Sequence, residues 1–237
     1  MATLYVIGTP IGNLEDMTFR AIRIMREVDV LACEDTRQTR KLLTHFEIPK
    51  PQQMFSCNQI NEHNSRQGIV KLLDAGRTVG LVSDAGMPGI SDPGYQVVTA
   101  AIEGGHRVEV IPGPSAGITA LISSGLPASS FYFAGFPPRK PGRRKKLLTA
   151  LKDMEATLLF FESPHRLGAF LADAKEVLGD RKAAVSIELT KKFEETDRDQ
   201  LSALTERYAD ETVRGEVTVT IAGFSKAAAP SDPIYGP

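Results

Sequence analysis

The sequence VGLVSDAGMPGISDPG, residues 79–94, decides the fold. Its first four residues are apolar or small and predict a buried strand. A loop rich in glycine and proline follows, and residues 95–103 then have the composition of a helix. In open α/β sheets, ligands bind at the carboxyl ends of strands, where such loops lie. This loop is longer than the roughly two to six residues of an ordinary strand-to-helix turn, so we expect it to line a ligand site.

The same order of strand, loop and helix recurs on both sides of this stretch. Apolar runs predict further strands at residues 4–7, 28–32, 53–57 and 107–111, and helices are predicted at about residues 16–28, 38–46 and 65–75. Such alternation favours a parallel sheet with helices on both faces. We therefore predict an N-terminal α/β domain over residues 1–114.

The pattern changes after Pro114. An apolar helix at residues 118–123 precedes predicted strands at 131–136, 157–161, 183–189 and 216–222, and predicted helices ending near 151 and spanning 167–178 and 201–209. This order predicts a C-terminal mixed α/β domain over residues 115–225 with antiparallel pairing. Residues 226–237 are rich in alanine and proline and are expected to form a flexible tail.

Bulk composition excludes several classes of protein. The 237 residues are 42% hydrophobic and carry a formal net charge of −1, so nucleic-acid binding would need a local basic patch. We expect no membrane span and no signal peptide, because no long apolar run is present. Cys33 and Cys57 have no metal-binding spacing. We therefore predict a cytoplasmic protein without a metal.

Residues 113–117, Gly-Pro-Ser-Ala-Gly, match the GxSxG pattern of a hydrolase nucleophile. They follow a predicted strand and precede a predicted helix, as that pattern requires. A triad on Ser115 would need His165 together with Asp153 or Glu162. Pro114 weakens this interpretation, because it removes a backbone donor directly before the serine.

A dense basic run follows the second half's first strand. Its six cations are Arg139, Lys140, Arg143, Arg144, Lys145 and Lys146. Such a run is often a solvated helix face. Alternatively, it neutralises phosphates of a nucleic acid, which would make binding strongly salt-dependent.

Two further polar segments, residues 33–37 and 58–64, follow predicted strands. In a parallel sheet they would lie at the same edge as the 79–94 loop and line a cleft there.

Taken together, five motifs resemble the RsmI family of bacterial 16S ribosomal RNA (cytidine 2′-O)-methyltransferases, in the tetrapyrrole methylase-like superfamily. The motifs are GTPIGNL at 8–14, CEDTR at 33–37, SDAGMPGISDPG at 83–94, IPGPSA at 111–116 and FESPHR at 161–166. The resemblance implies two α/β domains with S-adenosylmethionine (SAM) in the cleft between them, and usually a homodimer. It implies methylation of a cytidine 2′-hydroxyl in the decoding region of 16S ribosomal RNA.

The resemblance also implies site residues. The cofactor contacts would be Pro10, Ser83, Asp84, Ala85, Gly86, Ile90, Ser115, Ala116 and Glu162. Ser115 would then line the cofactor without acting as a nucleophile.

Methyl transfer to a ribose oxygen benefits from a general base. Candidates from the two polar segments are Glu34, Asp35, Glu62 and His63. RNA contacts are expected from Arg37 and from the six cations of the basic run. The alternatives are a small-molecule SAM methyltransferase of the tetrapyrrole type, a serine hydrolase using Ser115, and a non-catalytic RNA-binding module.

Overall fold

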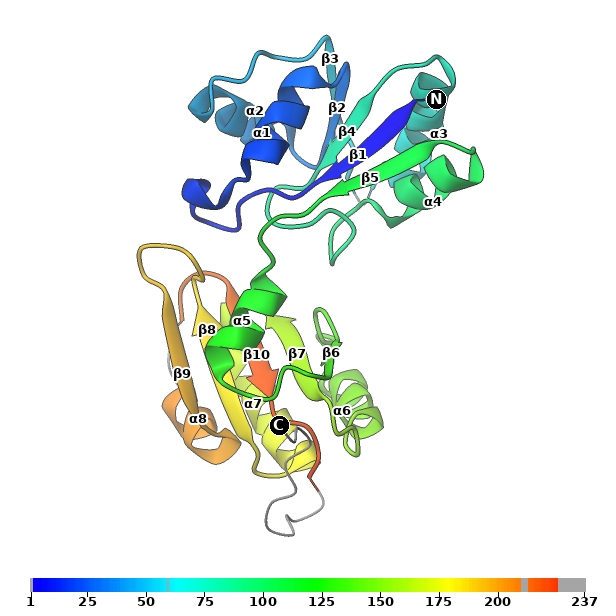
Figure 1. Ribbon diagram of the computed structural model, residues 1–237. Coiled ribbons are helices and arrows are strands. Elements are labelled where there is room, and N and C mark those ends of the chain that lie inside the picture. Colours follow the sequence, from blue (N-terminus) through cyan, green and yellow to red (C-terminus); the bar gives the residue numbers. More distant parts are fainter. Residues whose placement is uncertain (1, 59, 210–212, 226–237) are drawn as a thin grey trace, which may run out of the picture. The chain divides into compact units, whose positions relative to one another are not determined.

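Figure 1 shows a computed structural model of the chain, which describes residues 2–58, 60–209 and 213–225. The chain divides into two compact units, Met1–Ala116 and Gly117–Pro237. We call them unit 1 and unit 2 and describe each by itself. The predicted tail at 226–237 lies outside the described residues.

Unit 1 is built on a five-stranded sheet in which every pairing is parallel, in the order β3-β2-β4-β1-β5. Its strands are β1 (Thr3–Ile7), β2 (Val30–Cys33), β3 (Gln53–Ser56), β4 (Val79–Val82) and β5 (Arg107–Ile111). The parallel sheet predicted from the sequence is confirmed. Because all five strands run the same way, the segments that follow them emerge at one edge of the sheet.

Helices cover both faces of this sheet, as Figure 1 shows. On one face lie α1 (Phe19–Glu27) and α2 (Thr36–His45), and on the other lie α3 (Glu62–Asp74) and α4 (Tyr95–Glu103). Each face of the sheet has its own cluster of buried side chains. Met25, Leu31 and Leu43 belong to the buried cluster on the first face. Ile69 and Val97 belong to the buried cluster on the second face.

The starts of two helices in unit 1 can be compared with the prediction. A short 3-10 helix, Leu14–Asp16, precedes α1, and of the two residues suited to cap this helix, Asp16 and Thr18, it is Thr18 whose side chain accepts a hydrogen bond from the Ala21 amide. Helix α3 begins at Glu62, three residues before the predicted start. Glu62 and His63 therefore lie in the first turn of a helix and not in a loop.

Unit 2 contains a mixed sheet in the order β6-β7-β10-β8-β9. Its strands are β6 (Phe131–Phe133), β7 (Thr157–Glu162), β8 (Lys182–Ile187), β9 (Glu195–Gln200) and β10 (Val217–Ile221). The pair β6–β7 is parallel and the other pairs are antiparallel, which confirms the predicted mixed sheet. The sequence did not predict β9, because all six of its residues are polar.

Both faces of the second sheet are also covered. Helices α6 (Pro141–Ala150), α7 (Leu167–Leu178) and α8 (Leu201–Arg207) share one core with β7, β8 and β10, and a 3-10 helix, Pro164–Arg166, leads into α7. Helix α5 (Ala116–Ser124) lies against the opposite face, where Ser123 and Ser186 approach to 3.4 Å. All five residues of β10 are therefore buried, including Thr218 and Thr220. The alternating pattern of β10 alone would have placed them in solvent.

Among the described residues, no helix is long and apolar enough to cross a membrane.

Candidate functional site

Three segments of unit 1 meet at the carboxyl edge of its sheet. Thr9, after β1, exchanges two backbone hydrogen bonds with Gly86, at 2.9 and 3.1 Å. The Thr9 hydroxyl also donates to the Ser83 carbonyl, at 3.2 Å. These bonds connect the 8–14 segment to the 83–94 loop. The predicted cofactor residues Pro10, Ser83 and Gly86 therefore lie on two segments that hydrogen bonds hold together.

The third segment, residues 111–116, lies directly against the first, and their backbones approach closely at Gly8 and Gly113. A Cβ added to Gly8 would lie 2.8 Å from the Gly113 Cα, a distance that real Cβ atoms essentially never show. Gly86 has a φ of +78°, and an added Cβ there would meet Ile11 at 3.3 Å and the Pro114 carbonyl oxygen at 3.6 Å. Glycine is required at these approaches because it has no side chain and tolerates positive φ.

Two carboxylates at the same edge each accept a hydrogen bond from a backbone amide of the other loop. Glu34 accepts a hydrogen bond from the Asp84 amide, at 3.2 Å, and Asp84 accepts one from the Asp35 amide, at 3.0 Å. The loops after β2 and β4 are thereby joined. Burial raises the pKa of Asp84 above its ordinary value, although hydrogen bonding to the Asp35 amide opposes that change.

Asp35, one of the four candidate bases, is engaged by Arg37. It caps α2 by accepting from the Arg37 amide at 2.8 Å, and it pairs with the Arg37 guanidinium at 2.8 Å. These contacts lower the pKa of Asp35 to about 2, the side-chain hydrogen bond from Arg37 contributing most. A carboxylate with so low a pKa is a weak base. Arg37 remains largely exposed despite the pairing.

Glu62 and His63 also separate in the structure. Glu62 is buried, and its Oε1 accepts from the Gly94 and Gln96 amides at 2.9 and 3.1 Å. It thus satisfies backbone donors at the start of α4, which lacks a side-chain cap of its own. His63 is exposed on α3.

In unit 2, Glu162 ends β7 and its side chain is completely buried. Its Oε1 accepts from the Ser163 amide at 2.7 Å and pairs with Arg166. Its Oε2 has no hydrogen-bond partner among the described residues. Burial raises the pKa of Glu162, while the Ser163 amide and Arg166 oppose the increase.

The structure divides the basic run into two groups. Arg144 is only 3% exposed, and its Nε donates to Asp173 at 2.6 Å. Lys145 pairs with Glu176 at 2.6 Å and lies 3.5 Å from Asp173. The expectation that all six cations face RNA is wrong for Arg144, because the neighbouring helix α7 supplies it with a buried carboxylate.

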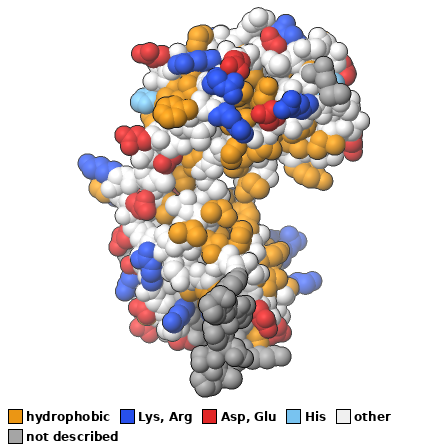
Figure 2. Space-filling model, in the orientation of Figure 1, with side chains coloured by type: hydrophobic (Ala, Val, Ile, Leu, Met, Phe, Trp, Pro, Cys, Tyr) orange, Lys and Arg blue, Asp and Glu red, His pale blue; other side chains and the backbone are white. Residues whose placement is uncertain are grey.

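The remaining four cations of the run are exposed: Arg139, Lys140, Arg143 and Lys146. Three exposed aromatic side chains, Phe131, Tyr132 and Phe136, precede them in the chain. Figure 2 shows basic and apolar side chains beside one another on the side of unit 2 where Figure 1 places α6. The sequence already places Phe133 and Phe136 beside the basic run, and basic residues next to aromatic ones are typical of a surface that binds single-stranded nucleic acid.

Within the described part of the chain, no group of three or more His, Cys, Asp or Glu side chains could hold a metal ion. Cys33 and Cys57 are buried free thiols.

Comparisons with known proteins agree on one family. A model described as Tetrapyrrole (Corrin/Porphyrin) Methylases matches residues 3–205. A Halalkalibacterium halodurans protein named Ribosomal RNA small subunit methyltransferase I is 46% identical over 230 residues, which cover 97% of this chain and 79% of that protein. The Bacillus subtilis protein of the same name is 45% identical, with coverages of 94% and 76%. The chain belongs to the ribosomal RNA small subunit methyltransferase I family of the tetrapyrrole methylases.

A solved structure of uroporphyrin-III C-methyl transferase from Thermus thermophilus, complexed with S-adenyl homocysteine, has the same fold. Its TM-score is 0.62 at 16% identity, covering 93% of this chain and 97% of that one. The likeness confirms the predicted α/β fold class. Membership of a methyltransferase family also favours methyl transfer over hydrolysis at Ser115, which immediately precedes α5.

Proposed function

We propose that this protein uses SAM to methylate the ribose 2′-hydroxyl of a cytidine in the decoding region of small-subunit ribosomal RNA. The observation that carries this proposal is the 46% identity, over 97% of the chain, to a protein named Ribosomal RNA small subunit methyltransferase I. The polar edge of the unit 1 sheet and the exposed cations of unit 2 supply chemistry that suits the reaction.

The edge of unit 1 fits a SAM molecule. Gly8, Gly86 and Gly113 allow backbone segments to approach closely where side chains would obstruct them. Exposed Asp84 and Ala85 lie between buried Ser83 and Gly86, which leaves backbone groups and one carboxylate to bind a polar ligand. We propose that these residues, with Pro10, Ile90, Ser115 and Ala116, hold the cofactor. SAM would supply an electrophilic methyl group.

Glu162 is the least direct of the proposed cofactor contacts. Its buried, unpartnered Oε2 is suited to a donor group of a ligand. Because the Glu162 side chain is fully buried, its ion pair with Arg166 would have to break before the cofactor could contact it.

Glu34 is the most suitable general base among the four predicted candidates. Asp35 is held at low pKa, and Glu62 is occupied by two backbone amides. Glu34 is partly exposed, and within the described part of the chain its carboxylate accepts one hydrogen bond, from the Asp84 amide to Oε2. We propose that Glu34 accepts the 2′-hydroxyl proton while Asp84 fixes the position of its loop through the Asp35 amide.

A matched set of variants tests the base. Glu34→Gln should reduce the methyl-transfer rate by about 10²–10⁴ with SAM affinity unchanged. Asp35→Asn should retain most of the rate. A rate retained in Glu34→Gln and lost in His63→Ala would assign the proton to the histidine instead.

The experiment for the function itself combines two measurements. Calorimetry should detect SAM binding, and radiolabelled SAM should transfer its methyl group to small ribosomal subunits from cells lacking the enzyme. Transfer to a tetrapyrrole and not to RNA would favour the small-molecule methyltransferase. Labelling of Ser115 by a fluorophosphonate, without SAM binding, would favour the hydrolase.

The family resemblance also leads us to propose a homodimer in the cytoplasm. Light scattering on the purified chain tests the dimer, because it measures molecular mass in solution.

A further inference from the structure

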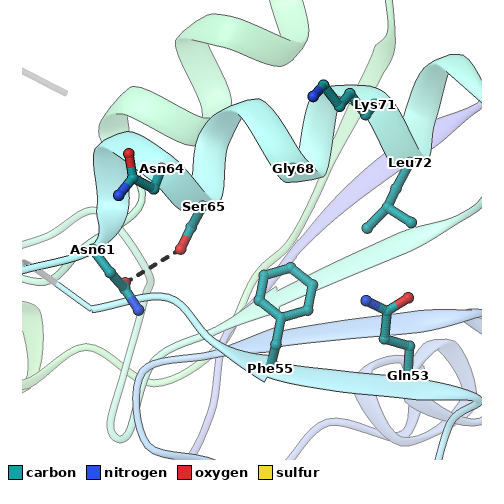
Figure 3. Close-up of a pocket in the computed structure, with 8 residues that line it drawn as sticks. All are labelled: Gln53, Phe55, Asn61, Asn64, Ser65, Gly68, Lys71 and Leu72. Carbon is teal, nitrogen blue, oxygen red and sulfur yellow. Dashed lines mark hydrogen bonds between the residues drawn. The ribbon is translucent and has the colours of Figure 1, made fainter.

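Unit 1 has a hollow between its edge strand β3 and helix α3, which we call the β3–α3 hollow. Its volume is about 500 Å³, within the range of roughly 300–1,000 Å³ typical of small-ligand sites. Figure 3 shows the Phe55 ring pointing from the strand toward the helix, near Ser65 and Leu72. Among the strands that the structure describes, β3 pairs with β2 alone and forms an edge of the sheet.

The lining combines an aromatic face, amides and one cation. Phe55 is half-buried, and one part of its ring packs against the core. Gln53, Asn64 and Lys71 are exposed, and within the described residues their side chains have no hydrogen-bond partner. No lining residue is acidic. This set suits a nucleotide, since a base stacks on an aromatic ring, amides bind its edge and a lysine binds phosphate.

The hollow adjoins the Glu34 loop through a chain of hydrogen bonds. At the hollow's end, the Asn61 amide donates to the Ser56 carbonyl at 3.0 Å. The Ser56 hydroxyl then donates to the Glu34 carbonyl at 3.0 Å. One end of the hollow, at Asn61, therefore lies at the same edge of the sheet as the proposed base.

We propose that the β3–α3 hollow binds an unpaired nucleotide flanking the methylated one, with its base stacked on Phe55 and its phosphate beside Lys71. This inference rests on the proposed function, because it takes RNA as the substrate. It adds a specificity site in unit 1 to the basic surface of unit 2.

Gly68 allows the hollow to be filled without disturbing the fold. It lies in the interior of α3, on the wall of the hollow, and an added Cβ would meet nothing within 4 Å. Replacement of a helical glycine also favours the helix. Gly68→Leu should therefore block the hollow, and Gly68→Ala is its matched control. Phe55→Leu removes the aromatic face but keeps an apolar side chain against the core.

The test uses the full chain and small ribosomal subunits whose RNA contains 4-thiouridine, taken from cells lacking the enzyme. Ultraviolet cross-linking followed by mass spectrometry identifies the peptides that touch RNA. We expect a cross-link on the peptide containing Phe55 in the wild type and in Gly68→Ala. In Gly68→Leu and Phe55→Leu, that cross-link should be lost and the KM for subunits should rise about 5- to 100-fold, with SAM affinity unchanged.

The outcomes separate the two proposals. Methylation with no Phe55 cross-link, or with a KM unaffected by Gly68→Leu, would overturn the hollow as an RNA site and leave the proposed function intact. A Phe55 cross-link without any methylation would support the hollow and overturn the proposed function. The absence of both would overturn both.

Discussion

Arg144 offers the sharpest test of how the structure divides the basic run. Arg144 is 3% exposed and its Nε donates to Asp173 at 2.6 Å, whereas Arg143 beside it is exposed. Removing one partner of a buried ion pair leaves the other charge uncompensated and costs about 3–5 kcal/mol. Lys145 lies 3.5 Å from Asp173 and would compensate only part of the loss. We therefore expect Arg144→Ala to lower the free energy of unfolding by about 3 kcal/mol, and Arg143→Ala by less than about 0.5 kcal/mol.

Urea denaturation followed by circular dichroism measures both values. The double variant Arg144→Met with Asp173→Leu should recover most of the loss, because two apolar side chains replace a buried charge pair at little cost.

RNA binding should show the opposite ranking. Arg143→Ala should reduce the slope of log affinity against log salt by roughly 0.7 if it meets one phosphate of a single strand. Arg144→Met, assayed under conditions where it is folded, should leave that slope unchanged. If Arg144→Ala costs no more stability than Arg143→Ala, or if it alone lowers the slope, the assignment of Arg144 to the core is refuted.

Four further outcomes follow from the contacts of unit 1. Gly8→Ala places a Cβ 2.8 Å from the Gly113 Cα and should destabilise by about 1–3 kcal/mol while weakening SAM binding, both measurable by calorimetry. Glu62→Ala removes the acceptor of two backbone amides and should cost about 1–3 kcal/mol in urea unfolding; an equal loss in Glu62→Gln, which retains an acceptor, would contradict this. Since the pKa of Asp35 is about 2 when folded and about 3.9 when unfolded, its stabilisation should be lost as the pH falls from about 4 to 2, and acid unfolding of Asp35→Asn should lack that component. Burial raises the pKa of Cys33 to about 11, so its thiol should react with maleimide only after denaturant is added; rapid labelling of native protein would show that it is accessible.

The centre of the parallel sheet could be predicted closely from the sequence. The bounds of β4, α4 and β5 are those expected, because apolar strands and glycine stops mark their ends clearly. Strand β9 was missed because its residues, Glu195 to Gln200, lie at the edge of a sheet and need no apolar face. Local pattern carries little information about such an edge.

The site was harder to predict because side-chain roles depend on partners far away in the chain. Glu62 looked like a candidate base, but the amides that donate to its carboxylate, those of Gly94 and Gln96, are more than thirty residues away in the chain. Arg144 looked like a surface residue, but it forms a buried ion pair with Asp173 on α7. Sequence spacing identifies which residues are chemically capable, whereas tertiary contacts determine which of them remain available.

The place of β10 in its sheet has a consequence for synthesis of the chain. Among the described residues, β10 (217–221) is the strand made last, yet it lies between β7 and β8 and pairs with both. On the ribosome, the unit 1 sheet has all five strands once residue 111 has emerged, whereas the unit 2 sheet must wait for residue 221. Until then β7 and β8 each expose an unpaired apolar edge, the kind of surface that chaperones bind.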